Sequence, residues 1–147
     1  MALIAVVDTS VIVPAFLTDE GTTAAAQALL RAAAKGNCRL ATSSHAILET
    51  TAAFHKAVRR DRLSSAAALQ MASLLPALPI ERIPVARVLR RATRIAFEQD
   101  LTVYDALFVA TALHLRVPIV TADRRQAQLA VGLFPVLSLA EALVAAE

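Results

Sequence analysis

A chain of 147 residues with 57% hydrophobic and 18% charged residues is large enough to bury a sizeable core, and this composition excludes intrinsic disorder. Mean hydropathy is high at +0.58, yet no run of about 18 uncharged apolar residues occurs, which excludes a membrane-spanning helix and predicts no membrane partner. The 15 basic and 12 acidic residues give a net charge of +3, which alone is too small to identify a nucleic-acid-binding protein.

The first half of the chain alternates between short apolar runs and longer stretches of helical pattern. Residues 3–7 form a continuous apolar run, which is typical of a buried parallel strand. An alanine-rich pattern predicts a helix over 22–35, ended by a Gly-Asn pair, and a short strand follows at 39–42. Further helices are predicted from 44 to about 60 and from 64 or 65 to 76.

The second half of the chain continues the alternation. Residues 80–83 form a third strand, which we expect at a sheet edge because prolines bracket it. Amphipathic patterns predict helices over 85–98 and 104–115. A fourth strand, nearly all apolar, is predicted at 117–121.

The C-terminal segment adds a short strand at 136–137 and a final helix, because Ser138-Leu139-Ala140-Glu141 matches a capping box. Strands that are apolar on both faces and alternate with helices predict an α/β fold, with a parallel sheet between layers of helices. We expect a single domain over residues 1–147, whose reactive crevice lies outside the carboxyl ends of the strands.

The N-terminus and the cysteine and histidine content restrict compartment and metal chemistry. Residues 1–8 lack a basic region and reach an acid at once, so they do not match a signal peptide, and we expect a cytoplasmic protein. The single cysteine, Cys38, excludes an internal disulfide and a cysteine-based metal cage. His45, His55 and His114 are scattered, so we interpret them as core, capping or surface residues and not as zinc ligands.

Four acidic residues stand apart from the others because their neighbours in the sequence are mostly apolar: Asp8, Glu49, Asp105 and Asp123. Each has a purely structural interpretation: a turn at Asp8, an exposed helix position for Glu49, a capping box closed by Asp105, and a helix cap at Asp123. Two of them follow predicted strands, however, and two lie in helices next to such strands. Because a doubly wound sheet brings the carboxyl ends of its strands to one rim, we favour a shared site.

Such a cluster of carboxylates needs protons or a cation, because two of them about 4 Å apart repel by about 4 kcal/mol at an effective dielectric constant of about 20. An all-oxygen set of ligands favours Mg²⁺ or Mn²⁺. In phosphodiester hydrolysis such an ion activates water and neutralises charge on the phosphate. Thr9, Ser10 and Thr121 are placed to order waters or to contact the phosphate, although turn chemistry also explains Ser10 and Thr121.

Arginines occur both beside the acids and away from them. Arg124 and Arg125 follow Asp123 directly and would lie close to a bound phosphate backbone. A second group recurs at helical spacing and comprises Arg87, Arg90, Arg91 and Arg94. We favour a solvated helix face over an RNA-tracking surface for this second group.

Four segments together resemble the PIN-domain ribonucleases: Val6-Val7-Asp8-Thr9-Ser10, Ser44 through Glu49, Leu101 through Ala110 with Tyr104-Asp105-Ala106, and Ile119 through Arg125 with Thr121-Ala122-Asp123. The length and the order of the motifs resemble the VapC-like toxins of type II toxin–antitoxin pairs. The resemblance spans nearly the whole chain, although residues 60–84 carry no motif.

This resemblance implies a PIN-like α/β/α sandwich around a five-stranded parallel sheet, and endoribonuclease activity that depends on Mg²⁺ or Mn²⁺ and uses a metal-activated water. It implies that the four acids share one pocket, with Asp8 and Asp105 as the principal direct metal ligands. Asp123 and Glu49 would ligate through water or complete a second site. The resemblance further implies a homodimer, and a cognate antitoxin protein whose C-terminal segment fills the groove.

Two other functions remain open at this point. One is a stand-alone PIN nuclease in RNA processing, and the other is a non-catalytic α/β binding module in which the acids only cap helices. Thermal stabilisation by Mn²⁺ that Asp8→Asn abolishes would distinguish a nuclease from a binding module.

Overall fold

The computed structural model describes residues 3–18, 21–123, 127–128, 132 and 135–147. Five parallel strands form one sheet in the order β3-β2-β1-β4-β5. The strands are β1 (Leu3–Val7), β2 (Arg39–Ser43), β3 (Ile80–Ile83), β4 (Ile119–Val120) and β5 (Val136–Leu137). The predicted α/β fold is therefore confirmed, and β3 lies at a sheet edge as its flanking prolines indicate.

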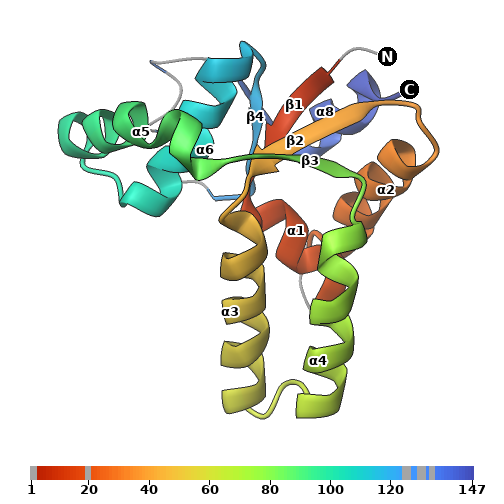
Figure 1. Cartoon of the computed structure of the whole chain (residues 1–147). Coiled ribbons are helices and arrows are strands. Elements are labelled where there is room, and N and C mark those ends of the chain that lie inside the picture. The colour runs from red at the N-terminus through yellow and green to blue at the C-terminus, as the bar shows by residue number, and fades with distance from the viewer. Residues whose placement is uncertain (1–2, 19–20, 124–126, 129–131, 133–134) are drawn as a thin grey trace.

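Helices cover both faces of the sheet (Figure 1). The described helices are α1 (Thr9–Phe16), α2 (Thr23–Ala34), α3 (Ala46–Arg59), α4 (Ser65–Leu74), α5 (Val85–Gln99), α6 (Val103–Leu115) and α8 (Leu139–Ala145), with a 3₁₀ turn, η1 (Leu75–Ala77). Helix α6 packs on β1, β2 and β4 with α5 outside it, whereas α2 and α8 pack together on the other face. None of the helices described is long and apolar enough to cross a membrane.

The core follows from the apolar strands in the middle of the sheet. Ala5, Val6 and Val7 of β1 are fully buried, as are both residues of β4. Burial of large side chains such as Leu29 of α2 and Phe108 of α6 completes this core. Since β1 has β2 on one side and β4 on the other, the residues that follow these three strands meet at one rim.

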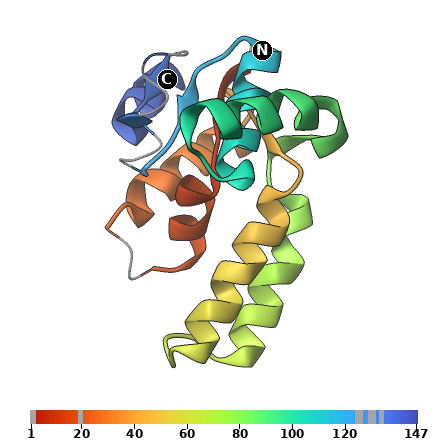
Figure 2. The ribbon, with the colours of Figure 1, turned by 90° about the vertical axis from the view of Figure 1, so that its left-hand side faces the viewer.

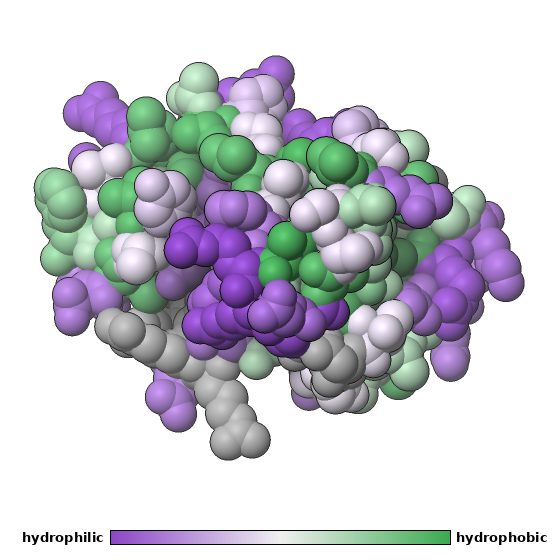
Figure 3. All heavy atoms as spheres, turned by 90° about the horizontal axis from the view of Figure 1, so that it is seen from below, coloured by the Kyte–Doolittle hydropathy of each residue, from purple (hydrophilic) through white to green (hydrophobic). Residues whose placement is uncertain are grey.

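Helices α3 and α4 form a hairpin that extends away from the sheet (Figure 2). The hairpin has a small apolar cluster of its own, in which Phe54 and Ala57 of α3 pack with Leu17 and Leu75. Helix α4 has no fully buried residue. Viewed from the far end of the hairpin, hydrophilic side chains gather at the centre of this face (Figure 3).

Two elements differ from the sequence prediction. Residues 9–16, for which the sequence pattern predicts no helix, form α1, because Asp8 caps its N-terminus and the burial of Val11 and Ile12 offsets the low helix propensity of β-branched residues and Pro14. The fourth strand is shorter than 117–121, because Arg116 takes a left-handed conformation and the amide of Val117 donates to Ala112 to end α6.

Candidate active site

Asp8 lies where β1 ends and is almost completely buried, with 2% of its surface exposed. As the N-cap of α1 it accepts a hydrogen bond from the backbone amide of Ser10 at 3.0 Å, and a second one from the Ser10 hydroxyl. The same Ser10 oxygen accepts from the amide of Ala122 at 2.8 Å and lies 3.3 Å from the Thr121 hydroxyl. Ser10 thus connects the end of β1 to the segment that follows β4.

The environment of Asp8 raises the pKa of its carboxyl group from 3.8 to about 6. Burial is the largest cause, because desolvation penalises the charged form, and the nearby Asp123 carboxylate adds repulsion. Hydrogen bonds from Ser10 and Thr121 act in the opposite direction and do not compensate. The protein therefore holds a carboxylate at this rim under conditions that disfavour its charge.

Asp123 is exposed and lies just beyond β4, where its backbone amide donates to the Thr121 hydroxyl at 3.0 Å. Its charge acts on Asp8, so the structure brings these two predicted acids together. Arg124 and Arg125, predicted to contact phosphate, lie outside the described residues.

Glu49 lies in the first turn of α3 and points back toward the end of β1. Its Oε1 accepts a hydrogen bond of 2.5 Å from the hydroxyl of Thr9, the residue after Asp8. Its Oε2 lies 3.9 Å from Nε2 of His45. The interpretation of Glu49 as a merely exposed helix position is wrong, because its carboxylate is half-buried among these groups.

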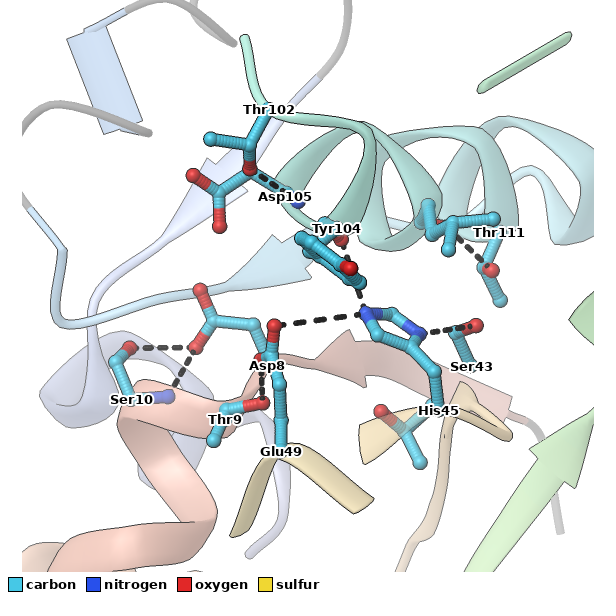
Figure 4. Close-up of polar contacts among 12 residues, drawn as sticks. Asp8, Thr9, Ser10, Ser43, His45, Glu49, Thr102, Tyr104, Asp105 and Thr111 are labelled. Carbon is cyan, nitrogen blue, oxygen red and sulfur yellow. Dashed lines mark hydrogen bonds and ion pairs between the residues drawn. The ribbon is translucent and has the colours of Figure 1, made fainter. Parts of the chain in front are cut away.

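Asp105 lies in the first turn of α6, which begins where the Thr102 hydroxyl accepts from the Asp105 amide at 3.1 Å. Of the predicted capping box, the hydrogen bond from the Asp105 amide to the Thr102 hydroxyl is therefore present. The carboxylates of Asp8, Glu49 and Asp105 are directed toward one another from three different elements (Figure 4). All four predicted acids thus lie around the same rim. The charges of Glu49 and Asp105 both act on the imidazole of His45.

His45 is the functional candidate that the sequence analysis did not single out. It directly precedes α3, its side chain is only 9% exposed, and it contacts Ser43, Glu49 and Tyr104 (Figure 4). Burial lowers the pKa of its imidazole, against the opposing charges of Glu49 and Asp105. The available signal was its position three residues after the strand predicted at 39–42, at the rim where parallel strands end.

A divalent cation fits the donor chemistry of this rim. In the stretches that the structure describes, no three His, Cys, Asp or Glu side chains are arranged to hold a metal ion together. Mg²⁺, however, keeps several waters and is commonly bound through one or two carboxylates. A cation beside Asp8 would offset both effects that raise its pKa, namely the burial of its charge and the repulsion from Asp123.

Comparisons with known proteins identify the family of this chain. The model of the PIN domain family matches residues 5–132. Among solved structures, the crystal structure of PAE2754 from Pyrobaculum aerophilum is similar, with 26% sequence identity, a TM-score of 0.71, and coverage of 99% of this chain and 98% of that chain. No curated protein matches. PIN domains are generally nucleases, and on the extent of the family match this chain belongs to the PIN domain family.

Proposed function

We propose that this protein is a divalent-metal-dependent endoribonuclease that hydrolyses RNA phosphodiester bonds at the rim formed by Asp8, Glu49, Asp105 and Asp123. The observation that carries the proposal is the buried Asp8 carboxylate, whose pKa is raised to about 6 beside the charge of Asp123. The repulsion between these two acids costs a scaffold stability, whereas a hard cation bound beside them would remove that cost.

In this proposal Asp8 and Asp105 hold Mg²⁺ or Mn²⁺ directly, and Asp123 and Glu49 act through water or complete a second site. When bound, the cation supplies a more acidic water and neutralises negative charge on the phosphate. Thr9 holds Glu49 through its hydroxyl, while Ser10 fixes both the Asp8 carboxylate and the backbone at Ala122. The hydroxyls of Ser10 and Thr121 hydrogen-bond to Asp8, so they are engaged in holding this acid, and Arg124 and Arg125 are proposed as the cationic contacts of the phosphate.

The test is cleavage of a mixed single-stranded RNA by the full chain with Mn²⁺, with Mg²⁺ and with EDTA. We expect internal cleavage with either ion, none in EDTA, and none for Asp8→Asn. Glu81→Gln is the matched control, because Glu81 is an exposed acid on β3 that pairs with Arg39 at 2.9 Å. Cleavage that persists in EDTA or in Asp8→Asn would refute the metal-dependent site.

We further propose that the chain is the toxin of a VapBC-type pair and is restrained by a cognate antitoxin. The support is the resemblance of its length and motif order to VapC-like toxins. Induced expression of the wild-type chain should arrest bacterial growth, while Asp8→Asn should not. Unimpaired growth despite accumulation of an active nuclease would instead favour a stand-alone role in RNA processing.

We also propose a homodimer formed through the outer face of α5. Phe97 is 81% exposed there, beside exposed Leu89, and both line a shallow hollow with Arg94 and Glu98. Two antiparallel copies of this face could pair their apolar side chains, and a two-fold axis would bring the same surface of each copy together. Sedimentation should show a dimer that Phe97→Glu dissociates, whereas Leu69→Glu on α4, also exposed, leaves it intact.

A further inference from the structure

His45 lies where three elements meet: the end of β2, the start of α3 and the first turn of α6. Nε2 is 3.0 Å from the backbone carbonyl oxygen of Tyr104, although 59 residues separate the two in the sequence. Nδ1 is 2.8 Å from the Ser43 hydroxyl. The imidazole also contacts the ring of Phe108, with centroids 4.5 Å apart and the ring planes tilted by 40°.

These partners fix the protonation of the ring. A carbonyl oxygen can only accept a hydrogen bond, so Nε2 carries the proton and donates to Tyr104. In the neutral ring, Nδ1 then offers a lone pair and accepts from the Ser43 hydroxyl, which is fully buried. Both ring nitrogens are therefore satisfied with one tautomer and one orientation.

We propose that His45 is a positioning residue, which holds the first turn of α6, and with it the Asp105 carboxylate, in register with Glu49 and the end of β1. This inference rests on the proposed nuclease function. Tyr104 immediately precedes Asp105, so the His45 hydrogen bond restrains the backbone next to that acid. Glu49, one helical turn beyond His45, lies 3.9 Å from the same Nε2.

The need for such a contact follows from where Asp105 sits. The first turn of a helix has unsatisfied backbone amides and frays more easily than the interior. Thr102, Val103 and Tyr104 at the start of α6 are exposed, so surrounding core packing contributes little to this turn. A displacement of about 1 Å is enough to reduce catalysis by about 100-fold, which makes an added backbone restraint valuable.

The test uses two amide side chains that resemble different halves of the ring. Gln places an amide near the position of Nε2 and can keep the hydrogen bond to Tyr104, whereas Asn reaches only the position of Nδ1 and can keep the one to Ser43. We therefore compare His45→Gln, His45→Asn and His45→Ala with the wild type, in full-length protein. His55→Gln is the matched control, because His55 is an exposed histidine on the same helix.

Three measurements separate positioning from folding. We expect His45→Asn and His45→Ala to lower kcat by about tenfold with KM within about twofold, and to need about tenfold more Mn²⁺ for half-maximal thermal stabilisation. For His45→Gln, both kcat and the Mn²⁺ concentration for half-maximal stabilisation should stay within about threefold of the wild-type values. In the metal-free wild type, nitrogen NMR of the ring should show the tautomer protonated at Nε2.

Other outcomes overturn the inference. Equal behaviour of the Gln and Asn variants, or wild-type Mn²⁺ binding and kcat in all three, would show that the Tyr104 hydrogen bond positions nothing. A neutral ring protonated at Nδ1 would also contradict the inference, because it could not donate a hydrogen bond from Nε2 to Tyr104. If His45→Ala does not fold, the comparison of His45→Gln with His45→Asn still tests the inference. A wild type that cleaves no RNA refutes the nuclease, while Mn²⁺ binding and the tautomer still decide the role of His45.

Discussion

The centre of the sheet and its rim are formed by the same strands, but the centre buries apolar side chains and the rim buries polar ones. At the centre, Val6 and Val7 of β1 and Val120 of β4 are fully buried among apolar neighbours. One residue further along, Asp8 and Thr121 are just as inaccessible but polar. The centre follows the rule that burial favours apolar groups, while the rim buries polar groups at a cost in stability.

The largest effect should come from neutralising the buried acid of the rim. Asp8→Asn should abolish detectable RNA cleavage, a fall of at least about 1000-fold, since it removes several kcal/mol of charge stabilisation in the transition state. The metal-free protein should be as stable as the wild type or more so, because Asn still caps α1 and the buried charge is gone. Cleavage assays and thermal unfolding in EDTA measure the two effects. Two results together would contradict this prediction: an Asp8→Asn variant that is less stable than the wild type, and a wild type that Mn²⁺ does not stabilise. They would show that Asp8 only caps α1 and that the rim binds no metal ion.

The pH dependence of stability should reveal the same charge through the proton that it binds. The folded state raises the pKa of Asp8 from 3.8 to about 6, so between these values the folded protein keeps a proton that the unfolded chain has released. The contribution of this group is fully present below about pH 4 and is lost as pH rises through about 6, a loss of roughly 3 kcal/mol. Chemical denaturation in EDTA at intervals from pH 4 to 7 should show this fall in the wild type relative to Asp8→Asn. Parallel curves for the two proteins would contradict the raised pKa.

Asp105→Asn tests the second acid, which lies on a helix and not after a strand. Activity should fall by about 100-fold, equivalent to somewhat under 3 kcal/mol, because a proposed direct ligand loses its charge. Stability should change by less than about 2 kcal/mol, since the Thr102 hydroxyl still accepts from the amide at position 105. Paired measurements of kcat/KM and of unfolding free energy decide between the roles. A loss of stability above that limit would favour a structural role for this carboxylate.

The smallest effect concerns a polar atom buried outside the rim. The hydroxyl of Thr50 in α3 is fully buried and has no hydrogen-bond partner among the described residues. Thr50→Val should therefore stabilise the protein by about 1 kcal/mol, because it replaces an unsatisfied hydroxyl by a methyl group of the same shape. Cleavage should stay at the wild-type level, as measured beside unfolding in denaturant. A destabilised Val variant would mean that this hydroxyl is satisfied after all.

The sequence allowed prediction of those parts of the molecule that depend on local pattern. The apolar run of β1, the capping box at Ser138 and the edge position of β3 are all present. Helix α1 was not predictable from propensity, because Pro14 and several β-branched residues conceal it and tertiary burial decides. The four acids could be proposed from their apolar neighbours, but their chemistry stays a prediction. His45 could not be assigned, since its role depends on a contact with Tyr104 that no local pattern encodes.

The α3–α4 hairpin has a consequence for how such a chain can diverge. Glu49 is fixed at the base of α3 by Thr9 and His45, and the apolar contacts of Phe54 and Ala57 follow directly above it. Only Val58 and Arg59 of α3 lie beyond Ala57, and α4 on the other side of the hairpin has no buried residue. Whole helical turns, each about 5.4 Å long, can therefore be added at the far end without changing the contacts that hold Glu49. The length of the hairpin can thus change independently of the acidic rim.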